Sequence, residues 1–203
     1  MSFKAGIATA LLLAAAPPVS SQALAKRIEL CYVCHGRNGQ SQTPLIPSIG
    51  GQPAFFVVAQ LFLFRDGRRG NAPQGMVDAA RPLTDDDLRA FGEFIARLPS
   101  PAPPAGEPEA TRAARGAALA EQHHCAACHN PDYSGREQMP RLAHQREDYL
   151  LKALRDYKSG ARLPYGRGME EIVALLGDAE MQDLAHYLAH LPAPPQRPRG
   201  RKP

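Results

Sequence analysis

Two short stretches, Cys31-Tyr-Val-Cys34-His35 and Cys125-Ala-Ala-Cys128-His129, contain every cysteine of the 203-residue chain and decide its fold. In each, two cysteines three positions apart are followed directly by a histidine. A disulfide within such a pair would close a very small loop and add little stability. Zinc ribbons separate their cysteine pairs by roughly 15–20 residues, whereas Cys31 and Cys125 are 94 positions apart. A thioredoxin-like redox pair would require a βαβ context, which the sequence does not show.

Covalent attachment of a haem explains this spacing better than the other three readings. Two thiols at positions i and i+3 lie on one side of a helical turn, so each can add to one vinyl group of the haem. The histidine after the second cysteine can then bind the iron as its proximal ligand. The sequence therefore predicts two covalently bound haem c groups, attached through Cys31, Cys34, Cys125 and Cys128 and bound by His35 and His129.

The chain also contains an internal duplication, which appears when the sequence is shifted against itself by 93 positions. The matching pairs include Pro47 and Pro140, Phe56 and Tyr149, Leu61 and Leu154, Arg69 and Arg162, and Met76 and Met169. Five prolines within Pro99–Pro108 indicate a semi-rigid linker between the copies. The predicted organisation is a signal peptide (1–25), a first domain (26–98), the linker (99–111), a second domain (112–192) and a basic Pro-rich tail (193–203).

Each copy is predicted to be all-α, because no strand pattern appears. A first helix is expected over about 25–34 in copy one and 110–128 in copy two, and a middle helix over about 53–64 and 147–157. The last helix has the clearest signature: Thr84 and Asp87 form a capping box before apolar residues that recur at 3–4 spacing. Aromatic residues make up only 6% of the chain and Trp is absent, so the core is thin and a porphyrin is expected to complete it.

The N-terminus has the pattern of a secretory signal peptide. Lys4 precedes the apolar run Ala5–Ala16, and Ala23-Leu24-Ala25 provides an A-x-A exit, with cleavage expected after Ala25 or Ala23. The run is shorter than the roughly 20 apolar residues that a spanning helix needs. The formal net charge of +4 comes from the two termini, so the folded part is near neutral and nucleic-acid binding is not expected. A cleaved signal peptide predicts a soluble periplasmic protein.

Together these features resemble class I cytochromes c, and the tandem arrangement is similar to the di-haem cytochrome c4 family. The resemblance covers residues 26–192 and implies two class I haem domains joined by the Pro-rich linker. It implies that Met76 and Met169 are the distal iron ligands, and that the carbonyls of Pro47 and Pro140 accept the N–H of the two proximal histidines. The chain departs from the pattern at His144, which replaces the glycine found at Gly51, and in the short first helix of copy one.

Several other polar residues have two readings each. Arg69 and Arg162 follow glycines that match between the two copies, and Tyr149 matches Phe56. These three residues either hold haem propionates or face water. His186 and His190 are spaced i, i+4 on a helix and could bind a metal, but no third ligand is apparent, which favours a solvated face.

A haem iron with His and Met on its two axial positions has no open site for substrate, so electron transfer rather than catalysis is expected. The resemblance implies a carrier that docks transiently, taking electrons from a quinol–cytochrome c reductase and passing them to a terminal oxidase. Two alternatives remain: the electron-accepting subunit of a periplasmic dehydrogenase and, less favoured by the paired methionines, a di-haem peroxidase.

Overall fold

The structure is a computed structural model that describes residues 21–162 and 168–192. The predicted tail (193–203) and all but the last residues of the predicted signal peptide lie outside this part of the chain. Within it, no helix is both long enough and apolar enough to cross a membrane.

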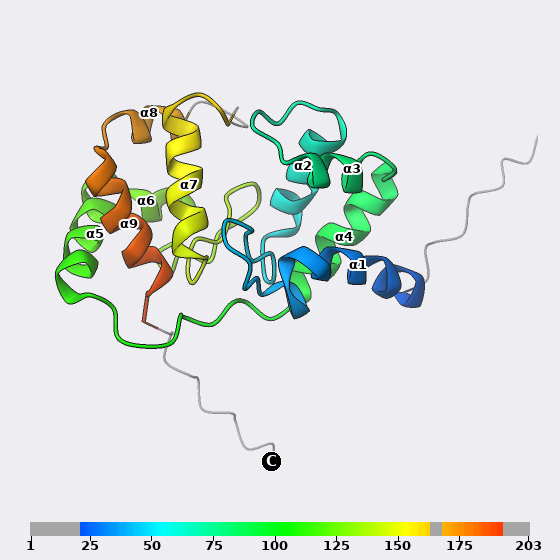
Figure 1. Cartoon of the computed structure of the whole chain (residues 1–203), viewed down its shortest axis with the longest axis horizontal. Coiled ribbons are helices and arrows are strands. Elements are labelled where there is room, and N and C mark those ends of the chain that lie inside the picture. Colours follow the sequence, from blue (N-terminus) through cyan, green and yellow to red (C-terminus); the bar gives the residue numbers. More distant parts are fainter. Residues whose placement is uncertain (1–20, 163–167, 193–203) are drawn as a thin grey trace, which may run out of the picture.

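The described residues fold into two helical domains that lie side by side, with the linker running along one edge of both (Figure 1). Domain 1 contains α1 (Ser21–His35), the 3₁₀ turn η1 (Arg37–Gly39), α2 (Ala54–Arg65), α3 (Gln74–Ala80) and α4 (Asp85–Arg97). Domain 2 contains α5 (Ala110–Gln122), α6 (Cys125–His129), α7 (Glu147–Lys158), α8 (Gly168–Ala174) and α9 (Asp178–Ala189). The β pairing in the described ranges is a single isolated bridge between Arg136 and Met139, so the predicted all-α class is confirmed.

The first helices of the two domains differ. In domain 1, α1 continues through the cysteine frame, and Leu24 and Ile28 pack with Phe91 and Ile95 of α4. In domain 2 the prediction of a single helix over 110–128 is wrong, because the structure has two separate helices there, α5 and α6. His124 adopts a left-handed conformation with φ 52°, which ends one helix and starts the next in a new direction.

The last helices form as predicted. The Thr84 hydroxyl accepts from the Asp87 amide at 3.2 Å, and the Asp87 carboxylate accepts from the Thr84 amide at 2.9 Å, which completes the capping box of α4. In domain 2, α9 packs closely across α5, and Met181, Leu184 and Leu188 are buried there. Met181 is therefore part of the core of domain 2.

Two short helices, α3 and α8, follow the middle helices and were not expected from the sequence. Met76 lies in the first turn of α3 and Met169 in the first turn of α8, so both methionines are carried by short helices. Pro73 precedes α3 as its N-cap, where its missing N–H costs nothing.

The domain interface is held by two reciprocal pairs of hydrogen bonds. The side-chain amide of Gln52 donates to the Arg141 carbonyl at 3.0 Å and accepts from the Arg141 amide at 2.9 Å. Gln145, the duplicate of Gln52, bonds in the same way to the carbonyl and amide of Ser48, at 2.7 and 2.8 Å. The two copies therefore dock face to face with approximate two-fold symmetry. Each glutamine side chain pairs with the backbone amide and carbonyl of one residue in the opposite domain.

Candidate functional site

The four cysteines lie where covalent attachment needs them. Cys31 and Cys34 are on the last turns of α1, and Cys125 and Cys128 are on α6. All four are free thiols, so the disulfide alternative does not hold. In the described part of the chain no cysteine belongs to a cluster of three or more potential metal ligands, which removes the four-cysteine zinc alternative. Cys34 and Cys128 are exposed, whereas burial raises the pKa of Cys31 and Cys125.

The two frame histidines are buried and share the same hydrogen bond. His35 Nδ1–H donates to the Pro47 carbonyl at 2.8 Å, and His129 Nδ1–H donates to the Pro140 carbonyl at 2.9 Å. Burial lowers the pKa of both imidazoles, which keeps them neutral. A neutral ring that donates from Nδ1 has its lone pair on Nε2. Each domain therefore presents an oriented nitrogen donor of the kind that binds haem iron.

In domain 1, a sulphur atom faces this nitrogen. Met76 Sδ lies 3.5 Å from His35 Nε2. Since the proton of the ring is on Nδ1, two electron-pair donors face each other with no hydrogen between them. Two facing electron-pair donors suit a metal ion, so the donor set of domain 1 fits an iron centre. With metal–nitrogen bonds of about 2.0–2.1 Å and metal–sulphur bonds of about 2.3 Å, a bound ion would move the two atoms apart by several tenths of an ångström.

Domain 2 brings its corresponding residues less close together. Met169 packs against the apolar cluster of this domain, and the described contacts do not place its sulphur at hydrogen-bond distance from His129. Residues 163–167, which lead into α8, lie outside the described part of the chain.

A cluster of polar side chains lies at the domain interface. Arg69 donates to the side-chain oxygen of Gln60 and, at 3.4 Å, to the Tyr149 hydroxyl. Arg162 donates to the same Gln60 oxygen at 3.3 Å and is only 6% exposed. The water-facing alternative is therefore wrong for Arg162, whereas Arg69 and Tyr149 are half-buried. The two guanidiniums stack on duplicated rings, Arg69 over Phe64 and Arg162 over Tyr157.

The positive charges of this interface cluster have no carboxylate partner among the described residues. Among the described residues, neither Arg69 nor Arg162 lies within ion-pair distance of a carboxylate. Burial lowers the pKa of Arg69, and the nearby charge of Arg162 lowers it further. Burial opposes ionisation of Tyr149, but the two guanidiniums outweigh it and lower the pKa of the phenol. One buried and one half-buried guanidinium without a carboxylate partner favour a negatively charged group, and haem carries two propionate carboxylates.

The surroundings of His144 explain why copy two has a histidine where copy one has Gly51. Its backbone is left-handed, with φ 60°, as is that of its duplicate Gly51, with φ 66°. At Gly51 a side chain would clash with Ser100, whereas the His144 imidazole reaches the linker. Its ring nitrogens lie 3.1 Å from the Pro101 carbonyl oxygen and 2.8 Å from that of Leu191. His144 thus joins the linker to the end of domain 2.

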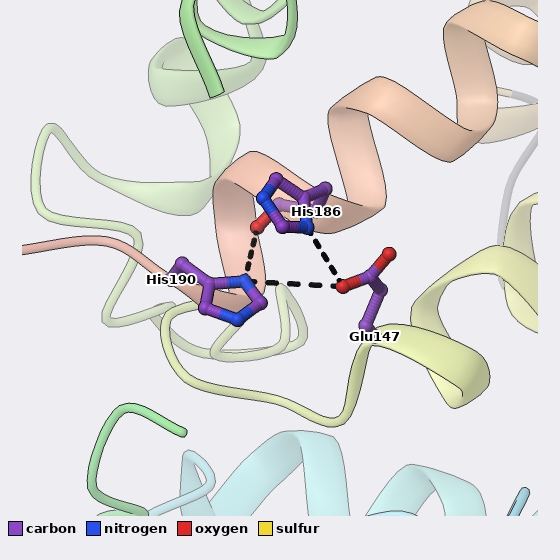
Figure 2. A group of neighbouring side chains, drawn as sticks. All are labelled: Glu147, His186 and His190. Carbon is purple, nitrogen blue, oxygen red and sulfur yellow. Dashed lines mark hydrogen bonds and ion pairs between the residues drawn. The ribbon is translucent and has the colours of Figure 1, made fainter. Parts of the chain in front are cut away.

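The solvated face predicted for His186 and His190 is wrong. His186 is 6% exposed, and His190 is half-buried. Both rings face the carboxylate of Glu147 at the start of α7 (Figure 2). Sequence analysis missed Glu147 because it lies 39 residues before His186, and only the packing of α7 on α9 brings the two together.

Comparisons with known proteins agree with this arrangement. Residues 113–192 match the model of the Cytochrome c family. The chain is 31% identical to cytochrome c4 of Thiocapsa roseopersicina over 88% of its own length and 96% of that protein. It is also 31% identical to a thiosulfate dehydrogenase electron acceptor of Thiomonas intermedia (strain K12), over 91% of its length and 85% of that protein. The crystal structure of reduced cytochrome c4 from Pseudomonas stutzeri has a TM-score of 0.73 and 26% identity, covering 85% of this chain and 98% of that one.

Proposed function

The chain belongs to the class I di-haem cytochromes c of the cytochrome c4 type, and we propose that it carries single electrons in the periplasm from a quinol-oxidising cytochrome bc complex to a terminal oxidase. Its cofactors are two covalently bound haem c groups, and proteins of this type are electron carriers. The carrier role rests chiefly on one observation, which is the pairing of His35 Nε2 with Met76 Sδ at 3.5 Å.

The four cysteines would attach the haems, and His35 and His129 would bind the irons. The carbonyls of Pro47 and Pro140 fix the tilt of these rings through the Nδ1–H bonds at 2.8 and 2.9 Å. When bound, each haem supplies a one-electron couple between ferrous and ferric iron. Met76 and Met169 are the residues that would complete the iron ligation in domains 1 and 2, which would leave neither domain an open site for a substrate. The protein is therefore a carrier and not an enzyme.

Arg69, Arg162 and Tyr149 hold propionate groups at the domain interface. The support is the absence of a carboxylate partner for either guanidinium among the described residues, although Arg162 is almost fully buried. A bound propionate accepts from the guanidinium and neutralises its charge. Because the cluster contains residues of both domains, it also places polar groups of the two cofactor sites on one shared surface. That surface is where we expect electrons to pass between domains.

A second candidate function is the electron acceptor of a periplasmic dehydrogenase. The observation that favours it is the 31% identity, over most of both chains, to a thiosulfate dehydrogenase electron acceptor. In this role the catalytic site would belong to a separate protein, and the present chain would supply only the two haems. Transient redox partners of either kind associate through charge-steered surfaces, so their rates fall as salt rises.

Reduction kinetics distinguish the two candidates. The purified ferric protein is mixed in a stopped-flow instrument with a quinol–cytochrome c reductase plus quinol, or with a thiosulfate dehydrogenase plus thiosulfate. The main proposal expects fast, salt-sensitive haem reduction by the first enzyme and fast reoxidation by a membrane oxidase. Fast reduction only by the dehydrogenase would replace it with the second candidate. A single haem per chain by mass spectrometry would contradict both.

A further inference from the structure

Glu147, His186 and His190 form a cluster of potential metal ligands that neither haem site uses. One ligand atom from each of the three lies within 4.8 Å of the others. Glu147 begins α7, whereas the two histidines lie one turn apart at the end of α9 (Figure 2). We propose that these three side chains bind one divalent transition-metal ion, Zn²⁺ or Cu²⁺, in domain 2.

The distances between the donor atoms suit such an ion. His186 Nδ1 lies 2.9 Å from Glu147 Oε2, and His190 Nδ1 lies 3.9 Å from the same oxygen. Zinc bonds to nitrogen and carboxylate oxygen are about 2.0–2.1 Å long, so ligand atoms at tetrahedral angles lie about 3.4 Å apart. The observed separations lie on either side of this value, and shifts of a few tenths of an ångström would equalise them.

The ligand set selects the class of metal. Two imidazoles and one carboxylate suit zinc and copper, whereas calcium and magnesium prefer oxygen ligands alone. Three protein ligands leave a fourth position for water. Because affinity for such sites rises from zinc to copper, Cu²⁺ should bind more tightly than Zn²⁺.

The carboxylate is already oriented for this role. Arg112 donates to Glu147 Oε1 at 2.9 Å, which leaves Oε2 facing the two rings. Arg112 also lies 3.4 Å from a carboxylate oxygen of Asp183, and Arg115 contacts the other oxygen of Asp183 at 2.5 Å. Together the two guanidiniums and the carboxylates of Glu147 and Asp183 carry no net charge, so a cation would not enter a net positive cluster.

Binding has a cost that keeps the affinity moderate. His186 Nε2 accepts from the backbone amide of Glu109 at 3.0 Å, so the ring proton is on Nδ1. Coordination through Nδ1 moves that proton to Nε2 and breaks the bond from the Glu109 amide. His190 Nδ1 must give up its bond to the His186 carbonyl at 2.9 Å, but that oxygen keeps the His190 backbone amide at 3.1 Å. The cost is therefore two hydrogen bonds, one of which leaves its carbonyl still paired, and metal coordination exceeds it.

Isothermal titration of the ferric protein, with both haems attached, tests the site directly with Zn²⁺ alone as the probe. We expect one ion per chain, and zinc-edge X-ray absorption should show two imidazoles and an oxygen ligand at about 2.0–2.1 Å. His190→Gln and Glu147→Gln should each weaken binding at least about tenfold. The matched control is His124→Asn, at the far end of α5 from Glu109, which keeps a residue suited to the left-handed backbone and should leave binding unchanged.

The haem spectrum of each variant shows independently whether domain 2 has folded. Unchanged zinc affinity in both His190→Gln and Glu147→Gln would overturn the proposal, since the ion would then bind elsewhere. Failure of the unmodified protein to bind Zn²⁺ or Cu²⁺ would overturn it as well. Loss of binding in His124→Asn, with the two cluster variants unaffected, would assign the metal to the exposed histidine instead. None of these outcomes depends on which redox partner the protein serves.

Discussion

His35 and Met76 place a nitrogen and a sulphur donor face to face at 3.5 Å, and the Pro47 carbonyl holds the imidazole in the tautomer that keeps the nitrogen unprotonated. At the residue scale, His35 could be predicted from the sequence, because covalent attachment requires a fixed local spacing of cysteine and histidine, whereas Pro47 and Met76 were implied by the resemblance to class I cytochromes c. The partners of Arg162 and Glu147 could not be predicted, since they come from other helices and depend on tertiary packing.

Replacing either distal methionine should free a coordination position on the iron of one haem only. In Met76→Ala or Met169→Ala we expect loss of about half of the weak far-red band that a thioether gives with ferric haem, and a lower potential for that haem alone. The variant should also bind carbon monoxide or cyanide quickly, because one coordination position is free. Visible spectra and a redox titration measure these changes. An unmodified protein that already binds these ligands fast and turns over peroxide would instead support the peroxidase alternative.

The Arg27–Asp87 pair makes domain 1 sensitive to acid. The hydrogen bond from Arg27 holds the pKa of Asp87 far below its usual value, and the Thr84 amide and hydroxyl act in the same direction. The folded state therefore keeps this carboxylate ionised at a pH where the unfolded chain takes up a proton. This contribution to stability is fully present above about pH 4 and is lost as the pH falls toward the folded pKa.

Asp87→Asn should consequently lower the free energy of unfolding of domain 1 by about 1–2 kcal/mol at pH 7, a value reduced by solvent around the partly exposed Arg27. Denaturant unfolding at a series of pH values should show the difference from the unmodified protein shrinking below about pH 4. Asp86→Asn, at the exposed neighbouring position on α4, is the control and should have little effect. A difference that stays constant down to pH 2 would contradict the assignment.

At the scale of helices, the sequence predicted those with an amphipathic pattern or a capping signal, such as α4, and missed those without one. The seven-residue helices α3 and α8 are too short to show a period, and Gln74-Gly75 at the start of α3 indicates a loop by composition. The break between α5 and α6 was also missed, because His124 takes a left-handed backbone without being a glycine. Tertiary packing, not local propensity, determines these features.

The crossing of α5 and α9 depends on Gly116. A side chain at this position would collide with the Asp183 carbonyl and with Cβ of Tyr187, so the two helices approach closely only because Gly116 has none. Gly116→Val should therefore force the helices apart and destabilise domain 2 by about 1–3 kcal/mol. Ala118→Val, on the exposed side of the same helix, should cost only the smaller helix propensity of valine.

Thermal unfolding followed by circular dichroism compares the two valine variants. The Gly116 variant should lower the melting temperature clearly more than the Ala118 variant, while domain 1 keeps its haem spectrum. Equal shifts in both would show that the close contact between α5 and α9 does not limit stability.

At the scale of the whole molecule, the duplication predicted two similar domains and a proline-rich linker, and the linker indeed contains no helix between α4 and α5. The structure ends this connection at Glu109, two residues before the predicted boundary of 111. The mode of docking was not predictable. Gln52 and Gln145 stand out as duplicated residues, but their pairing with the opposite backbone exists only once the domains have met.

These two glutamines should control electron exchange between the domains. Each is at most 5% exposed and satisfies one buried amide and one buried carbonyl of the partner domain. In the double variant Gln52→Ala and Gln145→Ala, those backbone groups lose their partners, which costs about 1–3 kcal/mol of stability for each group.

The two domains of this variant should then separate part of the time. We expect slower equilibration of an electron injected into one haem with the other, while the spectrum of each haem stays unchanged. Flash photolysis measures this rate. Asn71→Gly is the control, because it removes the exposed interdomain bond to Asp156 and keeps a residue that tolerates the left-handed backbone at φ 53°. If the double variant exchanges electrons as fast as the unmodified protein, the linker and the remaining interdomain bonds, such as that from the Phe56 amide to the Glu137 carbonyl, would suffice to hold the two domains together.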